Sequence, residues 1–170
     1  VDEATGEEIW KMPLIKKGPA SSPMVAHGKV FLQQGRLTSF DANTGEPGWE
    51  NKDVKSVNSS PNLWKSTVIC NSTKELIGID AVTGETIWKA PGGGDATPVV
   101  SGDYMVIPSR TDGSNLIAYK MTDEGPQQLW VKEFIARRYG SSAIIYGNHV
   151  YHLGSARHWC IELETGEVAW

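Results

Sequence analysis

DAVTGETIW, residues 80–88, is the most informative stretch of this 170-residue chain, because close copies of it recur along the whole sequence. The frame Thr-Gly-Glu-x-x-Trp occurs four times, at residues 5–10, 44–49, 83–88 and 165–170, and a degenerate copy ends at Trp130. The tryptophans that end these five copies, at positions 10, 49, 88, 130 and 170, are therefore 39, 39, 42 and 40 residues apart. A period of this length indicates a fold built from stacked supersecondary units.

Each residue type in the frame suits a tight turn between two strands. Eight residues before four of the tryptophans stands an acidic side chain: Asp2, Asp41, Asp80 and Glu162. Asp and Thr side chains can bond the backbone of their own turn, and Gly tolerates the positive φ that closes it. The indole presents on the order of 200 Å², too much for one small sheet to cover, so it must pack on a neighbouring sheet. We therefore predict a structural docking motif made of Gly6, Trp10, Asp41, Gly45, Trp49, Asp80, Gly84, Trp88, Trp130, Glu162, Gly166 and Trp170.

The residues around the frame repeat as well. A small residue stands two positions before the acidic one, as Ser39, Gly78 and Cys160, and Ala118 holds the same place in the third copy. A second signature follows each tryptophan, as SSPMV at 21–25, SSPNL at 59–63, ATPVV at 96–100 and SSAII at 141–145. Each unit is predicted to form four short antiparallel strands, A to D, joined by tight turns.

The sequence thus predicts an all-β fold, a β-propeller of about four four-stranded antiparallel blades, half of a seven- or eight-bladed ring. We expect one propeller region over 1–170, with the final strand of a preceding or closing blade at 1–14, blades at 15–53, 54–92 and 93–134, and an incomplete blade at 135–170. The third copy departs from the frame, because Tyr119, Lys120 and Met121 stand where the acidic residue should be and two extra residues precede Trp130. The geometry of its C–D turn stays open.

The frame resembles the tryptophan-docking motif of PQQ-like β-propellers over essentially the whole chain. The residues that carry the resemblance are Ser39, Asp41, Thr44, Gly45, Glu46 and Trp49 and their copies. This family includes quinoprotein alcohol dehydrogenases and the outer-membrane assembly factor BamB. WD40 propellers fit less well, since their Trp-Asp dipeptide and its Gly-His partner are absent.

Three arrangements are compatible with four periods. The chain can be a piece of a longer propeller, one half of a homodimer that completes an eight-bladed ring, or a closed four-bladed ring. An open arc leaves strand edges and a sheet face exposed, which favours pairing with further blades.

Composition excludes several classes of function. The chain has 16 basic and 20 acidic residues and a net charge of −4, which argues against a general nucleic-acid binder. No apolar run approaches the ~18 residues of a membrane span, so none is predicted. Cys70 and Cys160 lie in apolar strand patterns and are interpreted as small buried hydrophobic residues.

Catalytic signatures are missing from the sequence. The resemblance implies that quinoprotein chemistry would need Ca²⁺ held by carboxylates and an amide, an Asp base and usually a vicinal Cys-Cys pair, and the chain has no such pair. P-loop, GxSxG and HExxH motifs are also absent. Most acidic residues fall in the C–D turns, so Asp41 and Asp80 are interpreted as structural. We predict no catalytic, cofactor-binding or metal-binding residue, and expect neither PQQ nor Ca²⁺.

Charge is predicted to divide between the two rims of the arc. In a four-stranded blade the D–A and B–C connections emerge on one rim, and the A–B and C–D turns emerge on the other. The first rim would carry the basic residues and the second the acidic turns. We interpret the first as a candidate partner-binding rim for a carboxylate-bearing partner, the alternative being a solvated rim with no ligand. Its residues are Arg36, Lys74, Arg110, Arg137, Arg138, Tyr139 and Arg157.

The function expected from these features is that of a non-catalytic binding or scaffold module that docks a protein or peptide on a loop rim. The resemblance to BamB implies a bacterial protein of the periplasm or the extracellular space. The alternative is a fragment of a PQQ-dependent dehydrogenase.

Overall fold

The computed structural model describes residues 1–13, 20–56, 58–110, 115–133, 141–154 and 157–170, and these form antiparallel sheets without any helix. Blade one consists of β1 (Met24–Ala26), β2 (Lys29–Gln33), β3 (Leu37–Asp41) and β4 (Pro47–Asn51). Blade two consists of β5 (Asn62–Trp64), β6 (Thr67–Asn71), β7 (Glu75–Asp80) and β8 (Thr86–Pro91). Each sheet pairs its strands in sequence order, as tight turns between successive strands require.

The remaining two sheets follow the same order. Blade three consists of β9 (Val99–Ser101), β10 (Tyr104–Ser109), β11 (Asn115–Thr122) and β12 (Gly125–Glu133). Blade four consists of β13 (Ile144–Tyr146), β14 (His149–Leu153) and β15 (His158–Glu162). Its fourth strand is only begun, because Val168 forms an isolated bridge with Ile161.

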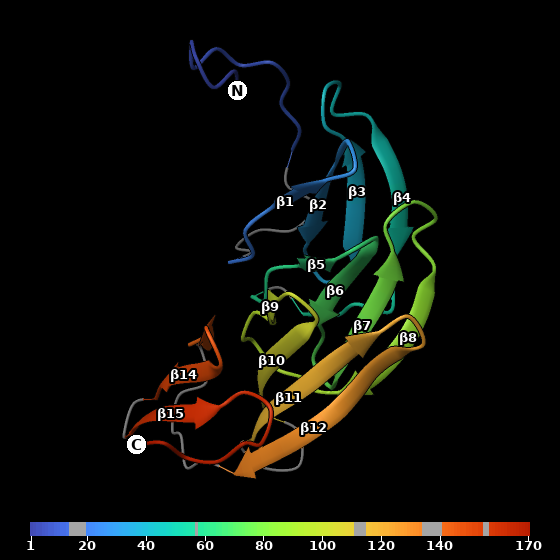
Figure 1. The fold of residues 1–170 in the computed structure, drawn as a ribbon. Helices are drawn as coiled ribbons and strands as arrows, with labels where there is room; N and C mark the ends of the chain where they lie inside the picture. The colour runs from blue at the N-terminus through green and yellow to red at the C-terminus, as the bar shows by residue number, and fades with distance from the viewer. Residues whose placement is uncertain (14–19, 57, 111–114, 134–140, 155–156) are drawn as a thin grey trace.

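The four blades stand side by side in an arc (Figure 1). Their first strands lie next to one another, since β5 contacts β9 and β9 contacts β13. The fourth strands β4, β8 and β12 lie on the opposite side of the arc (Figure 1). This arrangement confirms the predicted partial β-propeller.

The hydrophobic core lies between successive blades, as expected for small sheets that cannot bury their own faces. Phe31 of blade one packs in one cluster with Val68 and Ile77 of blade two. A second cluster joins blades two and three, and a third joins blades three and four. Both cysteines are free and buried, and burial raises the pKa of the Cys70 thiol.

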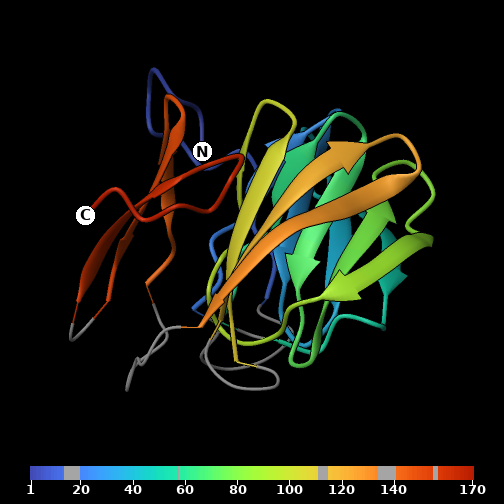
Figure 2. The ribbon, with the colours of Figure 1, turned by 60° about the horizontal axis from the view of Figure 1, so that its bottom comes forward.

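Hydrogen bonds define two rims, which form the two edges of the arc in Figure 2. On the turn rim, each C–D turn bonds the A–B turn of its own blade, as in Ala42 N–H to Gly28 O (2.9 Å) and Ala81 N–H to Ser66 O (2.9 Å). On the loop rim, D–A connections bond B–C connections, as in Gly35 N–H to Ser56 O (3.0 Å).

Residues 1–13 contain a turn at residues 3–5 but no strand, unlike the strand expected over 1–14. A fourth strand needs a third strand of its own blade as a hydrogen-bonding partner, and none lies among residues 1–13. Within the part of the chain that the structure describes, no helix is long and apolar enough to cross a membrane.

Candidate functional site

The tryptophans of the repeat bind the turn rim of the next blade. The indole N–H of Trp49 donates to the carbonyl oxygen of Ala81 (3.3 Å), and its ring covers Gly84. Trp10 makes the same contacts with Ala42 (2.9 Å) and Gly45. A glycine is required under the ring, because a Cβ on Gly84 would lie 2.4 Å from Trp49 Cδ2.

Trp130 repeats this contact at the joint between blades three and four. Its indole N–H donates to Leu163 O (2.9 Å), and its ring lies against Gly166. Trp170 is 64% exposed. Each of the three contacts thus joins a tryptophan to the residue after the acidic position of the following frame.

The acidic residue of the frame organises its own turn. Asp80 Oδ1 accepts hydrogen bonds from the N–H groups of Val82 and Thr83, both at 2.8 Å, and Gly84 has a φ of 78°. Backbone hydrogen bonds from the turn hold the pKa of the Asp80 carboxyl below its usual value, and they do the same at Asp41. The turn at Asp2 has the same bonds although no strand flanks it, so this short sequence specifies its own conformation.

Glu162 occupies the same position but acts differently. Its longer side chain leaves the turn and accepts a hydrogen bond from Asn148 Nδ2 (2.9 Å), and it lies 3.3 Å from His149 Nε2. The sequence treats Asp and Glu at this position as equivalent, whereas the structure assigns them different partners.

The third copy of the frame forms a different turn. Strands β11 and β12 extend to a short hairpin at Thr122 and Gly125, while the register shift between Ala118 and Tyr119 also occurs at the equivalent place in blades one and two. A Cβ added to Gly125 would lie 3.7 Å from the nearest atom of the Trp88 ring, so this contact is looser than that of Trp49 with Gly84. The buried indole N–H of Trp88 has no hydrogen-bond acceptor among the described residues. The ring instead lies tightly across Gly78 of its own sheet, where an added Cβ would lie 2.0 Å from Trp88 Cε2.

A ladder of backbone-to-hydroxyl bonds links all four blades near their first strands. Ser22 N–H donates to Ser60 Oγ (2.8 Å), Ser60 N–H to Thr97 Oγ1 (3.1 Å), and Thr97 N–H to Ser142 Oγ (3.1 Å). Sequence analysis found the signature that contains these residues but assigned it no role. The recurring Ser or Thr before the first strand was the available signal.

The candidate partner-binding rim is only partly described. Arg36, Lys74, Arg110 and Arg157 lie in the four B–C connections, on the loop rim. Arg137, Arg138 and Tyr139 lie outside the described residues.

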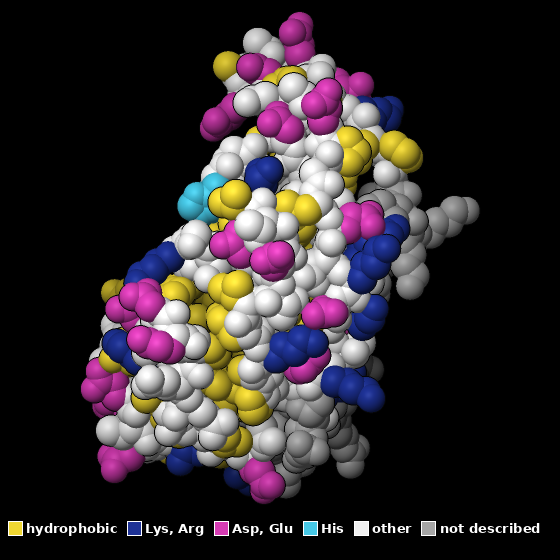
Figure 3. All heavy atoms as spheres, turned by 90° about the vertical axis from the view of Figure 1, so that its right-hand side faces the viewer, with side chains coloured by type: hydrophobic (Ala, Val, Ile, Leu, Met, Phe, Trp, Pro, Cys, Tyr) yellow, Lys and Arg dark blue, Asp and Glu magenta, His cyan; other side chains and the backbone are white. Residues whose placement is uncertain are grey.

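The loop rim carries carboxylates as well as cations, so the predicted separation of charge is incomplete. Arg36 binds Glu50 (3.1 Å) and Arg110 binds Asp95 (3.2 Å). Lys89 lies between Asp53 (3.4 Å) and Glu75 (3.3 Å). In Figure 3, Lys and Arg side chains gather along the edge beside the grey residues, with Asp and Glu among them. Sequence analysis did not predict these carboxylates on the loop rim, because they lie in strands and connections outside the repeated frame.

Lys74 and Arg157 differ from the paired arginines. Both side chains are exposed, and neither forms an ion pair within the described ranges. Lys74 lines an open groove of about 330 Å³ on the loop rim of blade two. Arg157 lines a second open groove, beside Trp170.

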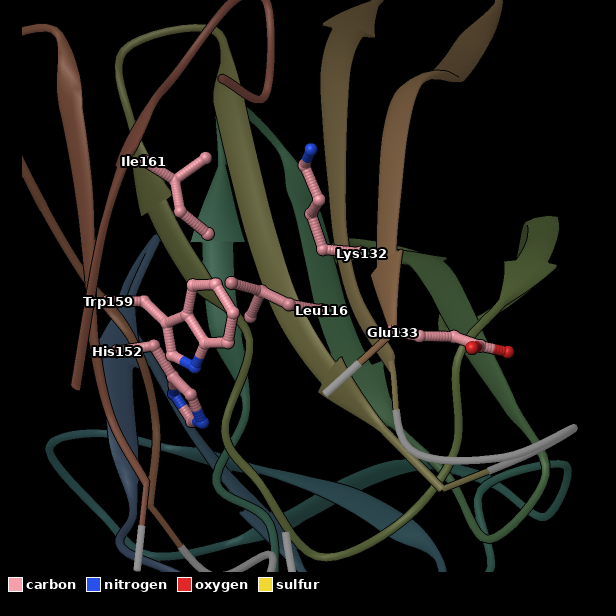
Figure 4. A pocket seen from close by; sticks show the side chains of 6 residues that line it. All are labelled: Leu116, Lys132, Glu133, His152, Trp159 and Ile161. Carbon is pink, nitrogen blue, oxygen red and sulfur yellow. The ribbon is translucent and has the colours of Figure 1, made fainter. Parts of the chain in front are cut away.

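A narrow cleft of about 30 Å³ lies between blades three and four (Figure 4). The Trp159 indole and the Leu116 side chain point toward each other across it, His152 lies beside the indole, and the Glu133 carboxylate points away (Figure 4). Burial lowers the pKa of His152, which favours its neutral form. A space of this size holds about one water molecule, which is too small for a cofactor.

The described residues do not fit a quinoprotein metal centre. They contain no group of three His, Cys, Asp or Glu side chains that could hold a metal ion. Asp2, Asp41 and Asp80 are bound to the backbone of their own turns. No chemical step through Ca²⁺ or PQQ follows from this geometry.

A family model described as outer membrane protein assembly factor BamB matches residues 1–170. The chain belongs to this family. No curated protein sequence matches it.

Solved structures show the same fold at low sequence identity. BamB from Moraxella catarrhalis is 20% identical with a TM-score of 0.71, and the match covers 87% of this chain and 46% of that one. Quinohemoprotein alcohol dehydrogenase from Comamonas testosteroni is 15% identical with a TM-score of 0.67, covering 90% and 34%. The computationally designed Ika4 protein is 14% identical with a TM-score of 0.67, covering 92% and 99%. This BamB-family chain thus spans less than half of the two natural proteins.

Proposed function

We propose that this BamB-family chain is a non-catalytic binding module that docks a protein or peptide partner on its loop rim. The observation that carries the proposal is the exposure of Lys74 and Arg157, which form no ion pair within the described residues. Cations that the fold does not use for its own joints are available to a partner, and such groups steer association and fix orientation.

The family supports the same proposal. Its description as an assembly factor implies protein partners and a place in the bacterial envelope, outside the cytoplasm. The similarity to quinohemoprotein alcohol dehydrogenase supports the alternative, a dehydrogenase fragment. That alternative requires ligands for Ca²⁺ and a quinone, and the described carboxylates of the turns are already bound to backbone N–H groups.

Photo-crosslinking from each rim tests the proposal. A photoreactive amino acid replaces Lys52, which is exposed beside the groove on the loop rim, so that Lys74 stays in place. As the matched control it replaces Val82 on the turn rim, which is 67% exposed. In envelope preparations of the host, the Lys52 probe is expected to label one discrete protein and the Val82 probe none. Equal labelling from both positions, or reduction of an electron-accepting dye after addition of PQQ and Ca²⁺, would contradict the proposal.

A second copy of the chain is a further proposed partner, since two arcs of four blades would complete an eight-bladed ring. Trp170 of one copy would then need the site on Gly45 and Ala42 that Trp10 occupies. Sedimentation of the 18.6 kDa chain tests this arrangement. Ring closure predicts a dimer that forms more tightly in Trp10→Ala, and a monomer in both samples contradicts it.

A further inference from the structure

The groove on the loop rim of blade two has a specific structural origin. It lies between the D–A connection that holds Asp53 and Lys55 and the B–C connection that holds Ser72, Thr73 and Lys74. The Lys55 N–H donates to Ser72 Oγ (2.9 Å), so the two connections are joined at the base of the groove. The space above this bond is open, with a volume of about 330 Å³.

Blade three closes the corresponding space with an arginine. Arg110 stands four residues after Val106, which pairs with Ala118, and Thr73 stands four residues after Ile69, which pairs with Gly78. The Arg110 N–H donates to Gly93 O (2.9 Å), and its guanidinium binds Asp95 (3.2 Å). Thr73 at the same place in blade two is too short to cross from one connection to the other.

The walls of the groove leave two ammonium groups available. Lys89 is held between Asp53 and Glu75, and Asp53 also accepts a hydrogen bond from Thr86 Oγ1 (3.0 Å). These contacts lower the pKa of Asp53 and raise that of Lys89, so both stay ionised and largely neutralise each other. Lys55 donates to the carbonyl oxygen of Lys52.

Neither Lys55 nor Lys74 pairs with a carboxylate among the described residues. The groove therefore holds three lysines and two carboxylates, an excess of one positive charge, beside the exposed Thr73.

We propose that this groove binds a side-chain carboxylate of an acidic peptide segment, with Lys55 and Lys74 as its contacts. The inference rests on the proposed docking function and names the chemistry of the partner. A carboxylate suits the site because each lysine ammonium is a compact charge with three rotatable N–H donors, which can donate to a single carboxylate oxygen without the fork geometry of arginine. Each exposed pair contributes little by itself, so several acidic residues in sequence are needed for measurable affinity.

Titration of a fluorescein-labelled octaglutamate peptide into the whole chain tests the groove. The double variant K55E/K74E is expected to bind about tenfold more weakly, since two exposed pairs are lost and repulsion replaces them. The control K11E/K29E changes the net charge equally away from the groove, since Lys11 is 78% exposed, and it is expected to retain wild-type affinity. Equal weakening in both double variants would show diffuse charge attraction and overturn the proposal.

The variant Thr73→Trp tests the role of the open space in the groove independently of the charge of its lysines. The substitution fills the space without changing the net charge, and we expect it to weaken peptide binding as much as K55E/K74E. Unchanged binding in Thr73→Trp overturns the groove as the site. Inorganic phosphate that displaces the peptide at lower concentration than acetate overturns the choice of a carboxylate.

The two proposals fail in different ways. Loss of peptide binding at the groove, with crosslinking from position 52 retained, contradicts only the carboxylate site. Loss of crosslinking from the loop rim contradicts the docking function, whatever the peptide does.

Discussion

The joint between blades one and two differs from the joint between blades two and three, although both are built around a tryptophan at the start of a fourth strand. Trp49 lies on Gly84 and donates to Ala81, within a turn that Asp80 organises. Trp88 meets the hairpin at Gly125, and its N–H finds no acceptor among the described residues. Both joints nevertheless enclose a continuous apolar cluster.

This difference shows which interactions build the joint and which refine it. The apolar clusters are present with either turn, so burial of the sheet faces supplies the main stabilisation. The indole hydrogen bond and the Asp turn fix the angle at which the next blade is held. At the irregular joint, Lys65 of blade two binds Asp123 in the hairpin of blade three (2.7 Å).

The glycine under each indole is expected to give the largest contrast between the joints. In Gly84→Ala a methyl group would overlap Trp49 and occupy a residue with a φ of 78°, which should cost about 2–4 kcal/mol. In Gly125→Ala the nearest ring atom is 3.7 Å away, so only the backbone strain of a residue with a φ of 125° remains, about 1–3 kcal/mol. Urea unfolding of both variants measures the difference. Equal costs would mean that Trp49 moves aside freely.

Replacement of each indole by a phenyl ring should separate the joints next. Both substitutions remove packed ring atoms, but only Trp49→Phe also loses a hydrogen bond, to Ala81 O, because the Trp88 N–H has no acceptor among the described residues. Trp49→Phe should therefore cost about 1 kcal/mol more than Trp88→Phe. Thermal unfolding of the pair checks this expectation. A larger loss in Trp88→Phe would show that its N–H is satisfied in solution.

Acid should weaken the regular joint through Asp80. Its folded pKa lies below the ordinary value of 3.8, because Thr83 and Val82 donate to the carboxylate. This contribution is therefore complete above the unfolded pKa and is lost as pH falls through the lowered folded pKa. Between about pH 5 and about pH 3, a range that spans the ordinary Asp pKa, the midpoint of thermal unfolding should fall less in Asp80→Asn than in the wild type. If the unfolding midpoints of Asp80→Asn and the wild type fall equally with pH, Asp80 does not contribute to the acid sensitivity of this joint.

The ion pair at the irregular joint should have the smallest effect. The Lys65 and Asp123 side chains are 58% and 80% exposed, so Asp123→Ala should cost less than about 1 kcal/mol. The cost should shrink further when salt screens the pair. Unfolding at low and high salt measures it, and a loss comparable with that of Gly84→Ala would make the pair the main connection of this joint.

Much of the fold follows from short sequence segments, because their physics is local. The turn at Asp2 forms its hydrogen bonds with no sheet beside it, so Asp, Thr and Gly at fixed spacing are sufficient. The period of the tryptophans gives the number of blades, since each large ring needs a neighbouring sheet. The irregular turn of the third copy was visible as a departure from the frame, but not the hairpin at Thr122 and Gly125 that replaces it.

The candidate site was less predictable. The basic residues of the B–C connections lie on the loop rim, as the sequence predicts. Arg36 and Arg110, however, bind Glu50 and Asp95, which no sequence motif marks. These partners stand 14 and 15 residues away from their arginines, in strand β4 and in a D–A connection, so only the folded chain brings them together. The opening at Thr73 is visible only by comparison with Arg110 in the folded blades.

The tryptophan frame from which the blades were inferred therefore determined the turns, the strand order and the packing of one blade on the next. Only the tertiary structure decided that Trp88 lacks the acceptor that Trp49 has, and that Lys74 stays available while Arg110 does not. The physical reason is one of range. Turn conformation is set by a few residues within one repeat. The acceptor of the Trp49 indole comes from the neighbouring blade, and the ion partners of Arg36 and Arg110 lie outside the repeated frame.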